Sequence, residues 1–423
     1  MTPPATPPAT PPAAPRTPGK AAFVFVFITV MLDMLALGIM VPVLPKLLVQ
    51  FEGGDIAKAA AVTGVFGSVW ALMQFVFSPV VGALSDRYGR RPVILLSNLG
   101  MGLDYLLMAL APSVAWLFVG RVVSGITSAS FSTAAAYIAD VTPAEKRAAQ
   151  FGMLGAAFGL GFVVGPAVGG LLGGIDLRLP FWVAGGLSLA NAAYGFFILP
   201  ESLPPERRAR FQWKVANPLG SLKLLRSSPE LIKLAAATVL YFVAHEVLPS
   251  TFVLYADYRY GWTERMVGLS LAAVGVCSTV VSAALVGPAV RRLGERRALL
   301  TGLSFAAAGF VLYGLAPVGA LFLAGIPLVS LFGLAGPSMQ ALMTQRVGAS
   351  EQGQLQGALS SLRGITGMVG PLLFTQTFAA AIGRFSSFNL PGAPYLLAAV
   401  LLGGCIVLSV RARATVPEAA RSP

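Results

Sequence analysis

The stretch Gly82–Pro92, which reads GALSDRYGRRP, is short, polar and crowded with charge. An apolar run ends at Leu84, just inside this stretch, and another begins at Val93, directly after it. Its charged side chains are those of one acid and three arginines, Asp86, Arg87, Arg90 and Arg91. Basic residues collect in the cytoplasmic loops of membrane proteins. The stretch therefore predicts a tight cytoplasmic loop between two membrane-spanning helices.

The composition indicates a protein that crosses a membrane many times. Of its 423 residues, 56% are hydrophobic and only 11% are charged, whereas soluble domains carry roughly 25% charged residues. The mean hydropathy of +0.76 agrees with this. The net charge of +13 comes mostly from basic residues between the apolar runs. We interpret it as a topology signal, and we expect the lipid bilayer as a partner and no nucleic acid.

The residues suited to metal or redox chemistry are too few for several classes of site. Cys277 and Cys405 both lie in apolar runs, so we expect buried apolar side chains and no disulfide framework. A single histidine excludes a multi-His metal site. The chain has neither a nucleophile–base set nor the phosphate-binding loop of an ATP-driven pump. The sequence therefore predicts neither an enzyme nor a metal or other cofactor.

Twelve apolar segments are long enough to cross a bilayer, for which a helix needs about 20 residues. These segments are 22–44, 61–84, 92–112, 114–138, 149–173, 180–200, 231–256, 265–290, 298–317, 319–343, 353–380 and 393–410. The longest connection, 201–230, is rich in Pro, Arg and Lys and separates two sets of six. The predicted fold is therefore an all-α membrane protein, with twelve transmembrane helices in two pseudo-symmetric six-helix bundles.

This division predicts five parts of the chain. Residues 1–20 repeat a PPAT-like unit, and we expect a disordered, Pro-rich cytoplasmic tail. An N-terminal bundle over 21–200, a cytoplasmic linker over 201–230 and a C-terminal bundle over 231–411 follow, and 412–423 form a second cytoplasmic tail. Most of the 30 Lys and Arg residues lie on the side of the N-terminus. This bias places both termini in the cytoplasm.

The two halves resemble each other when one is shifted by 205 residues. The coinciding landmarks are Gly82 with Gly287, Gly89 with Gly294, Gly120 with Gly325, Gly152 with Gly357, and Gly165-Pro166 with Gly370-Pro371. The loop 287–297, GPAVRRLGERR, is a degraded copy of the 82–92 loop in which Arg291 stands in the place of Asp86. Parallel repeats of this kind place a substrate site near the membrane midplane, between the halves.

These motifs resemble the major facilitator superfamily, and within it the twelve-span drug/proton antiporters, with the tetracycline/proton group the most similar. The 82–92 loop is similar to the superfamily signature G-x-L-x-D-R-x-G-R-R between spans two and three. The other stretches that carry the resemblance are Leu117, Arg121 and Gly125 in span four, 161–170, 37–45, 89–107, 120–127 and 370–374. The resemblance covers about residues 25 to 410. It implies export, with protons as the coupling ion.

Three charged residues lie at similar depths in the first four spans. Asp104 precedes Ser113, near the turn between spans three and four, by nine residues, and Arg121 follows it by eight. Both therefore lie roughly 12–13 Å from that turn. Asp33 lies nine residues before Pro42, at the outer end of span one. Because a charge inside the bilayer costs roughly 3 kcal/mol, such residues tend to be functional. We predict that Asp33 and Asp104 share a cavity and bind protons or cationic substrate groups, tuned by Arg121. The alternative is a structural ion cluster.

The second half has its own polar residues within spans. His245 and Glu246 are neighbours in span seven, and neighbours on a helix point 100° apart, so we expect that they do not both face one cavity squarely. Both are candidate proton or cation sites, with packing against another helix as the alternative. Arg363 in span eleven either faces the cavity or snorkels to the membrane surface. Gln74 and Gln340 are candidates to hydrogen-bond a substrate, or they pack between helices.

The resemblance implies a gate and a hinge. In the family, the 82–92 loop holds the two bundles together on the cytoplasmic side when the site opens outward. The residues implied in this cytoplasmic gate are Gly82, Asp86, Arg87, Gly89, Arg90, Arg91 and Asp140. Asp86 either pairs with the arginines or faces the N-terminus of a neighbouring helix, and Asp140 is expected to pair with the loop arginines. The residues implied in a span-five hinge are Gly161, Gly165, Pro166 and Gly169, with ordinary small-residue packing as the alternative.

The chain also departs from the tetracycline group. That group has a histidine in span eight and an acid in span nine, where this chain has Ser278 and Ala306, which calls a chelated-metal tetracycline site into question. The favoured hypothesis is a monomeric, proton-coupled exporter of drug-like amphipathic small molecules, with tetracyclines among the candidates. It would work by alternating access in a bacterial-type inner membrane. The alternatives are an uptake symporter of a small nutrient and a non-transporting membrane sensor or scaffold.

Overall fold

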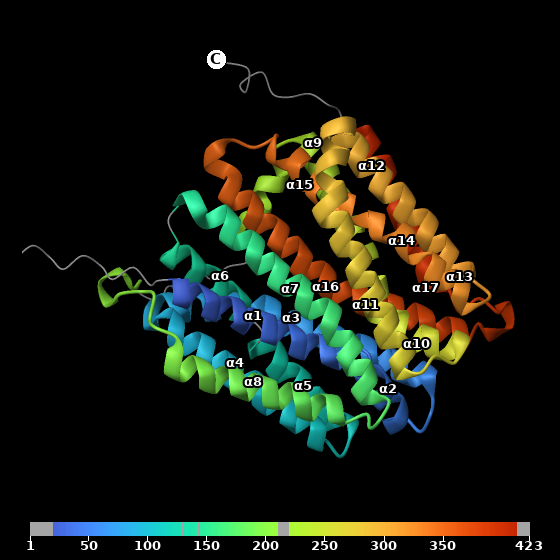
Figure 1. Ribbon diagram of the computed structural model, residues 1–423. Helices are drawn as coiled ribbons and strands as arrows, with labels where there is room; N and C mark the ends of the chain where they lie inside the picture. Colours follow the sequence, from blue (N-terminus) through green and yellow to red (C-terminus); the bar gives the residue numbers. More distant parts are fainter. Residues whose placement is uncertain (1–19, 128–129, 143, 210–219, 413–423) are drawn as a thin grey trace, which may run out of the picture.

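The chain folds into helices joined by short turns (Figure 1). The computed structural model describes residues 20–127, 130–142, 144–209 and 220–412. Nearly all of the two predicted tails lies outside the described residues, and so does 210–219 of the predicted linker. Each helix satisfies most of its backbone N–H and C=O groups internally, which is the condition for crossing a lipid bilayer.

The first half of the described chain is built from helices with the following bounds: α1 (Lys20–Met40), α2 (Leu44–Phe51), α3 (Ile56–Tyr88), α4 (Arg90–Leu110), α5 (Val114–Thr127), α6 (Ser130–Val141), α7 (Ala144–Gly173) and α8 (Leu179–Ile198). The second half is built from η2 (Gly220–Arg226), α9 (Pro229–His245), α10 (Val247–Tyr260), α11 (Glu264–Val280), the π-helical turn η3 (Val281–Leu285), α12 (Val286–Leu315), α13 (Gly319–Ala324), α14 (Ile326–Ser330), η4 (Leu331–Leu334), α15 (Ala335–Thr344), α16 (Gln352–Ile382) and α17 (Ala393–Arg411).

Eleven helical stretches of the described chain are long and apolar enough to cross a membrane. One of them, Glu264–Leu315, has 52 residues, which is roughly 78 Å of helix and more than twice a hydrocarbon layer of about 30 Å. Its backbone turns at Gly294, where φ is 74° and ψ is 162°, so this stretch makes two crossings. The predicted twelve-span, all-α membrane fold is therefore confirmed.

Breaks in several spans are a feature that the apolar runs did not reveal. Span one is interrupted at residues 41–43, between α1 and α2, and span seven at Glu246, between α9 and α10. Val41 and Glu246 are separated by the repeat distance of 205 residues, so the two breaks are equivalent. Irregular backbone within a membrane is tolerated where it is buried in protein or lines a cavity.

The two polar loops repeat the same backbone conformation. Gly89, between α3 and α4, has φ 106° and ψ 160°, close to the values at Gly294 and in a region that favours glycine. Arg91 donates from Nη2 to a carbonyl oxygen of α8 at 2.6 Å, and Arg296, its equivalent, donates from Nη2 to a carbonyl oxygen of α17 at 2.5 Å. The predicted pseudo-symmetry is confirmed at these loops. We call their side of the molecule the loop face and the opposite side the α2 face.

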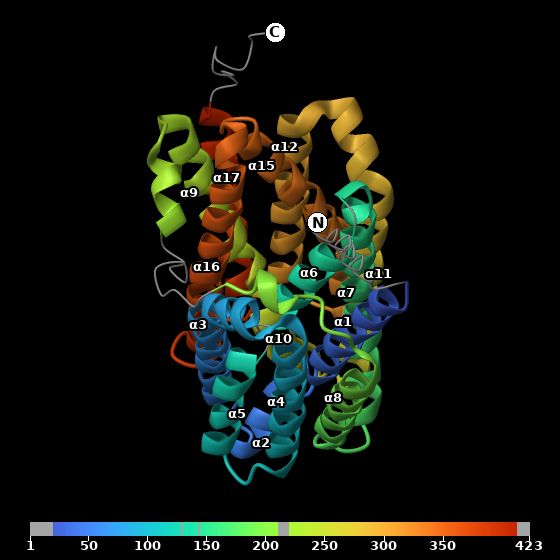
Figure 2. The ribbon, with the colours of Figure 1, turned by 90° about the vertical axis from the view of Figure 1, so that its left-hand side faces the viewer.

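The two halves touch over only part of their length. Figure 2 shows helices of the first half, such as α4, α5 and α8, below helices of the second half, such as α9, α12 and α17. The contacts between the halves join α3 to α16, α7 to α11, and α10 to α2 and α3. In Figure 1 the halves converge at α2 and α10 and diverge from there. The molecule is therefore closed at the α2 face and spread toward the loop face.

The buried apolar side chains form one large cluster in the second half and two clusters in the first. The large cluster is rich in aromatic rings: the ring centroids of Tyr313 and Phe322 lie 3.8 Å apart, and the Tyr255 hydroxyl donates to the Tyr313 carbonyl at 2.9 Å. In the first half, Asp33 on α1 and Asn98 on α4 lie between the two clusters and are themselves buried. A polar layer therefore crosses the core of the first half.

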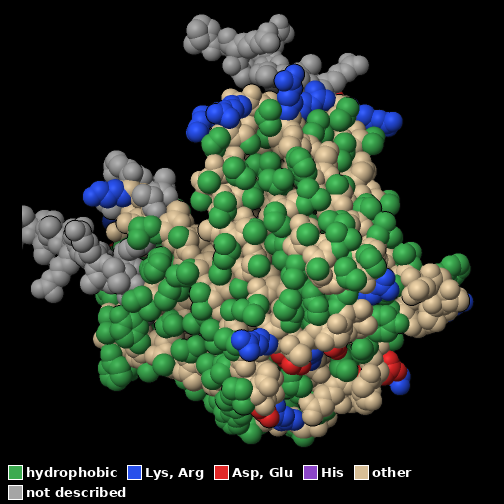
Figure 3. All heavy atoms as spheres, turned by 45° about the vertical axis from the view of Figure 1, so that its right-hand side comes forward, with side chains coloured by type: hydrophobic (Ala, Val, Ile, Leu, Met, Phe, Trp, Pro, Cys, Tyr) green, Lys and Arg blue, Asp and Glu red, His purple; other side chains and the backbone are tan. Residues whose placement is uncertain are grey.

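The outside of the molecule is apolar, as contact with lipid requires. Large apolar side chains are exposed along the helices, among them Phe197 at 83%, Val400 at 71% and Leu96 at 69%. Figure 3 shows apolar side chains over the flank of the molecule, with Lys and Arg gathered at its upper end and acidic side chains together with further Lys and Arg in its lower part. The described surface thus has an apolar flank between two charged ends.

Helices α1 and α7 approach closely through glycines. A β-carbon at Gly165 would lie 2.7 Å from the Cα atom of Gly38, and one at Gly161 would lie 2.7 Å from the Cβ atom of Met34. One at Gly169 would overlap the carbonyl group of Ile39. This stretch therefore packs closely through small residues, as in the alternative to a hinge. Helix α7 continues through Pro166 as far as Gly173, and the hinge role stays a prediction.

Replacing Gly165 with alanine is expected to destabilise the protein, because the added β-carbon meets backbone atoms of α1, which cannot move aside as a flexible side chain can. The free energy of unfolding should fall by about 1–3 kcal/mol, measured by unfolding the purified protein in detergent. Gly186→Ala on α8 is the matched control, since nothing lies within 4 Å of its β-carbon position. Equal losses of stability in both variants would contradict this account of the packing.

Candidate functional site

A cavity of about 2070 Å³ lies between the two halves. Its wall is built from α1, α3 and α7 of the first half and from α9, α11, α14 and α16 of the second. Gly152 and Gly357, near the loop-face ends of α7 and α16, belong to the lining, whereas contacts between α2 and α10 close the space at the other end. The cavity therefore reaches toward the loop face.

Asp33 brings a carboxyl group to the wall of this cavity. Its side chain lies in the polar layer of the first half and is only 6% exposed. Asn191 of α8 holds it in place: its Nδ2 donates to Asp33 Oδ1 at 3.2 Å and to the Thr29 carbonyl at 3.2 Å. The amide thus ties the carboxyl group to the backbone of its own helix.

Arg121 also lines the cavity, and Asp104 lies behind it. The Arg121 Nη1 atom donates to the Met40 sulfur at 3.9 Å, and its guanidinium group lies 5.5 Å from the ring centroid of Trp70. Asp104 is 2% exposed and faces α5, where a β-carbon at Gly120 would lie 2.7 Å from its Oδ1 atom. The prediction of one shared cavity thus holds for Asp33 and Arg121 and not for Asp104, which points into the first half.

Asp104 and Arg121 nevertheless influence each other through charge. Their side chains are close enough for their opposite charges to attract each other, although they form no ion pair among the described contacts. Neither Asp104 oxygen atom has a hydrogen-bond partner of good geometry in the described chain. A buried carboxyl group without such a partner inside a membrane-spanning helix is costly, and residues of this kind tend to be functional.

In the second half, His245 and Glu246 both line the cavity. They do so although they are neighbours in sequence; α9 ends at His245, and Glu246 stands between α9 and α10. The His245 ring lies 5.8 Å from the ring of Phe332. The side chain of Glu246 packs against Gly370, where a β-carbon would lie 2.5 Å from Glu246 Cβ. The span-seven break therefore presents two polar side chains to one space.

Arg363 and Gln74 line the cavity as well, and Gln340 does not. The Arg363 guanidinium group lies 5.0 Å from the ring centroid of Phe242, so Arg363 faces the cavity and does not snorkel. Gln340 is exposed, and its Nε2 atom donates to Gln356 Oε1 at 3.3 Å, which links α15 to α16. Its predicted contact with a substrate is thus not supported by its position, because the end of α15 lies outside the cavity wall.

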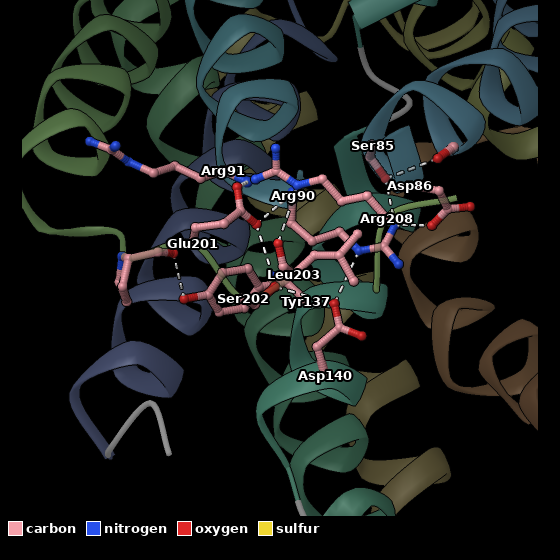
Figure 4. A network of polar contacts seen from close by, with 12 residues as sticks. Ser85, Asp86, Arg90, Arg91, Tyr137, Asp140, Glu201, Ser202, Leu203 and Arg208 are labelled. Carbon is pink, nitrogen blue, oxygen red and sulfur yellow. Dashed lines mark hydrogen bonds and ion pairs between the residues drawn. The ribbon is translucent and has the colours of Figure 1, made fainter. Parts of the chain in front are cut away.

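The 82–92 loop is held by contacts within the first half (Figure 4). Arg90 forms ion pairs with Asp86 at 2.5 Å and with Asp140 of α6 at 3.1 Å, and it donates to the Ser85 hydroxyl at 2.6 Å. The predicted pairing of Asp140 with the loop is confirmed, and Asp86 takes the arginine-paired alternative. The side chain of Arg87 lies over the ring of Tyr88, 5.0 Å from its centroid. Among the described residues, the loop's ion pairs and inter-element hydrogen bonds are made with the first half and with the linker that follows it.

Glu201 anchors the same loop and was missed by the sequence reasoning. It follows the end of α8, and its two carboxylate oxygens accept from the backbone N–H groups of Arg90 at 2.8 Å and Arg91 at 3.3 Å (Figure 4). An acid at the first N–H groups of a helix is stabilised by their unpaired donors and by the helix dipole. Its sequence signal was weak, because Glu201 stands at the start of a polar linker.

Lys46 is a second residue that the sequence analysis did not single out. Its Nζ atom crosses to the second half, where it lies 2.7 Å from the Trp262 carbonyl oxygen, 3.3 Å from Asp257 Oδ1 and 3.1 Å from Glu264 Oε1. The residue is 9% exposed. Beside it, a β-carbon at Gly268 would lie 2.9 Å from the Cα atom of Gly170. These contacts close the α2 end of the cavity.

No cluster of three or more His, Cys, Asp or Glu side chains that could hold a metal ion occurs in the described part of the chain. The site is instead a large, mainly apolar space with a few charged groups, of which Asp33 and Arg121 come from the first half and Glu246 and Arg363 from the second. Such an arrangement suits the binding of an amphipathic small molecule and lacks the paired nucleophile and base of a hydrolytic site.

Comparison with known proteins agrees with this geometry. The model of the Major Facilitator Superfamily matches residues 26–371 and 234–422. The chain is 38% identical over 385 residues to the tetracycline resistance protein, class C, of Escherichia coli, which covers 91% of this chain and 95% of that protein. It is 37% identical over 404 residues to the class G protein of Vibrio anguillarum, covering 94% and 99%. Multidrug resistance protein 2 of Bacillus subtilis (strain 168) is 27% identical, covering 84% and 88%.

Solved structures share the fold. The nucleoside transporter NupG superposes with a TM-score of 0.73 at 13% identity, covering 92% of this chain and 98% of its own. The human organic anion transporter MFSD10 superposes with a TM-score of 0.68 at 24% identity, covering 93% and 99%. These likenesses concern the fold alone. Together with the relatives above 30% identity, they lead to one conclusion: the chain is a multi-pass membrane transporter, not an enzyme, and it belongs to the Major Facilitator Superfamily.

Proposed function

We propose that this transporter is a proton-coupled exporter of drug-like amphipathic small molecules. The observation that carries the proposal is the cavity between the halves, closed at the α2 face, with the buried carboxyl group of Asp33 at its wall. Similarity to tetracycline and multidrug resistance proteins supports export of drugs. A nearly apolar wall with few fixed polar groups accepts varied ligands of this kind.

The proposed topology follows from charge. The loop face is the cytoplasmic side of a bacterial-type inner membrane, because most Lys and Arg residues lie on it, and both termini are on that side. The six-span bundles over 21–200 and 231–411 act as the two moving bodies of a functional monomer, joined by the linker 201–230. A cavity that reaches the loop face then receives its substrate from the cytoplasm, and alternating access delivers it to the other side.

In this proposal protons bind in the first half. Asp33 at the cavity wall and Asp104 behind Arg121 are the carboxyl groups that take up and release protons, and Arg121 adjusts their affinity through its charge. Tetracycline is a candidate substrate by similarity. Ser278 and Ala306 stand where the tetracycline group has a histidine and an acid, and this favours a ligand bound without its chelated metal.

Asp33→Asn is expected to abolish proton-driven exchange, because the amide cannot carry a proton between the two sides although it keeps the shape of the side chain. Substrate-induced proton release from inverted vesicles should fall at least about tenfold, a change in free energy of about 1.4 kcal/mol or more. Gln340→Ala, outside the cavity, is the control.

Cells expressing the parent, but not Asp104→Asn, should be protected against some members of a drug panel that includes tetracycline. Full exchange by Asp33→Asn would contradict the coupling role, and proton-driven accumulation of a sugar or acid in whole cells would favour uptake.

Asp86→Asn is expected to slow transport without reducing the amount of protein in the membrane. Arg90 then loses the partner at 2.5 Å that fixes its guanidinium group beside Asp140, so the loop no longer keeps the geometry proposed for the gate. The rate of substrate export and the protein level are measured together in the same cells. Arg291→Asn, at the equivalent position of the second half, serves as the comparison. Unchanged transport by Asp86→Asn would leave the loop as a topology signal only.

A further inference from the structure

We propose that Glu246 and Arg363 form a bipolar substrate subsite that selects amphipathic molecules carrying both a basic and an acidic group. The inference rests on the proposed export function and adds the charge class of the substrate. Both side chains line the cavity. Within the described residues, neither forms an ion pair or a side-chain hydrogen bond, and the only ring that Arg363 contacts is that of Phe242.

In the described chain the two groups line the same cavity without forming an ion pair. Glu246 packs at Gly370 of α16, and Arg363 lies seven residues earlier on the same helix. Seven residues of helix span roughly 10 Å, or about two turns. In the described chain the carboxylate and the guanidinium group face the same space without an ion pair and attract each other only through charge, so each is left for water or for a ligand.

The charged groups of the first half differ in this respect. Asp33 accepts a hydrogen bond from Asn191, and Arg121 donates to the Met40 sulfur. Glu246 and Arg363 have no such side-chain partner among the described residues and act on each other through charge alone, so they are the charges open to the cavity. A ligand that buries only one of the open charges leaves the other desolvated and unpaired, which is costly. A bipolar ligand compensates both.

The wall between the two charges suits an aromatic body. Tyr241 and Phe332 have ring centroids 4.8 Å apart, and His245 lies over Phe332. Phe242 lies beneath Arg363. Flat rings stack on such surfaces and gain from offset aromatic contacts. The subsite therefore fits a flat, aromatic molecule with a cationic group near Glu246 and an anionic group near Arg363.

Three fluorescent probes of different charge test this subsite in purified protein: norfloxacin, a zwitterion at neutral pH, ethidium, a cation, and anilinonaphthalene sulfonate, an anion. Norfloxacin is expected to bind the parent most tightly. Glu246→Gln should weaken norfloxacin and ethidium by about tenfold or more and spare the sulfonate, and Arg363→Gln should weaken norfloxacin and the sulfonate and spare ethidium. Gln340→Ala is the control for all three.

Two outcomes overturn the subsite: norfloxacin affinity unchanged in both variants, or no binding of norfloxacin to the parent. Equal losses for all three probes in one variant also overturn it, since they indicate a general disturbance of the cavity. Binding in detergent needs no proton gradient, so this result is independent of the exchange assay with Asp33→Asn. A failure of charge selection is therefore distinguishable from a failure of proton-coupled export.

The Lys46 contacts carry a second, independent inference. We infer that Lys46 is a latch that holds the α2 end closed. Its ammonium group has three oxygen acceptors from the second half and is almost excluded from water, and the side chains of Asp257 and Glu264 are only 27% and 22% exposed. Separating such ions without water is costly, whereas hydration repays most of the loss once the end opens. The latch thus favours a fully closed end over a partly open one.

Distances between spin labels at Ile175 and Val318 test the latch. These exposed residues lie in turns at the α2 face, one in each half, and Cys277 and Cys405 are first replaced by serine. Lys46→Met leaves two acids facing each other and should add a population with a longer distance. Lys46→Arg should keep the parental distribution, and the exchanged pair Lys46→Glu with Glu264→Lys should restore it. A parental distribution in Lys46→Met, or no recovery in the exchanged pair, would overturn the latch.

Discussion

A charge placed in the hydrocarbon layer of a membrane costs several kcal/mol unless water or a partner compensates it. This cost determines where the charged side chains of the protein lie and which partners they have. In the first half it produces the polar layer between two apolar clusters, where Asn191 holds Asp33. In the second half it leaves Glu246 and Arg363 at the wall of a cavity that reaches the loop face. At the α2 end it joins Lys46 to two acids. The charges inside the membrane are thus compensated in two ways, by access to the cavity or by ion pairs at its closed end.

The repeat of 205 residues gives both halves the same scaffold and different charges. Arg90 pairs with Asp140 in the first half, and the equivalent residues Glu295 and Gln345 share a hydrogen bond at 3.4 Å in the second. The described second half keeps a hydrogen bond at this place but has no ion pair there, because the neutral amide of Gln345 stands where Asp140 has a carboxylate. A hydrogen bond with only one charged partner is weaker than an ion pair. Glu201 caps α4, and the residue 205 positions later in the described second half is Ile406. A gate at the loop face would therefore depend mainly on the first half.

The apolar runs predicted the spans because each helix must bury its own backbone polar groups, and the loop glycines predicted the repeat because few residues adopt a positive φ. Contacts between spans were harder to predict. His245 and Glu246 both line the cavity although they are neighbours, Asp104 lies behind Arg121, and Gln340 lies outside the cavity wall. The partners of Lys46 stand more than 200 residues away in sequence, so its role depends on packing between halves that no local pattern records.

The contacts between the halves also suggest how they could move. Near the midplane the halves meet through small residues: a β-carbon at Gly67 would lie 2.9 Å from the side chain of Pro371, and Ser68 donates to the Met368 carbonyl at 2.5 Å. Such surfaces carry few interlocking side chains, so helices can tilt on them with little repacking. The ions around Lys46 lie at one end of this pivot, where a small rotation gives the largest separation. Closure at the α2 face is therefore set by few, strong contacts, and rocking by many weak ones.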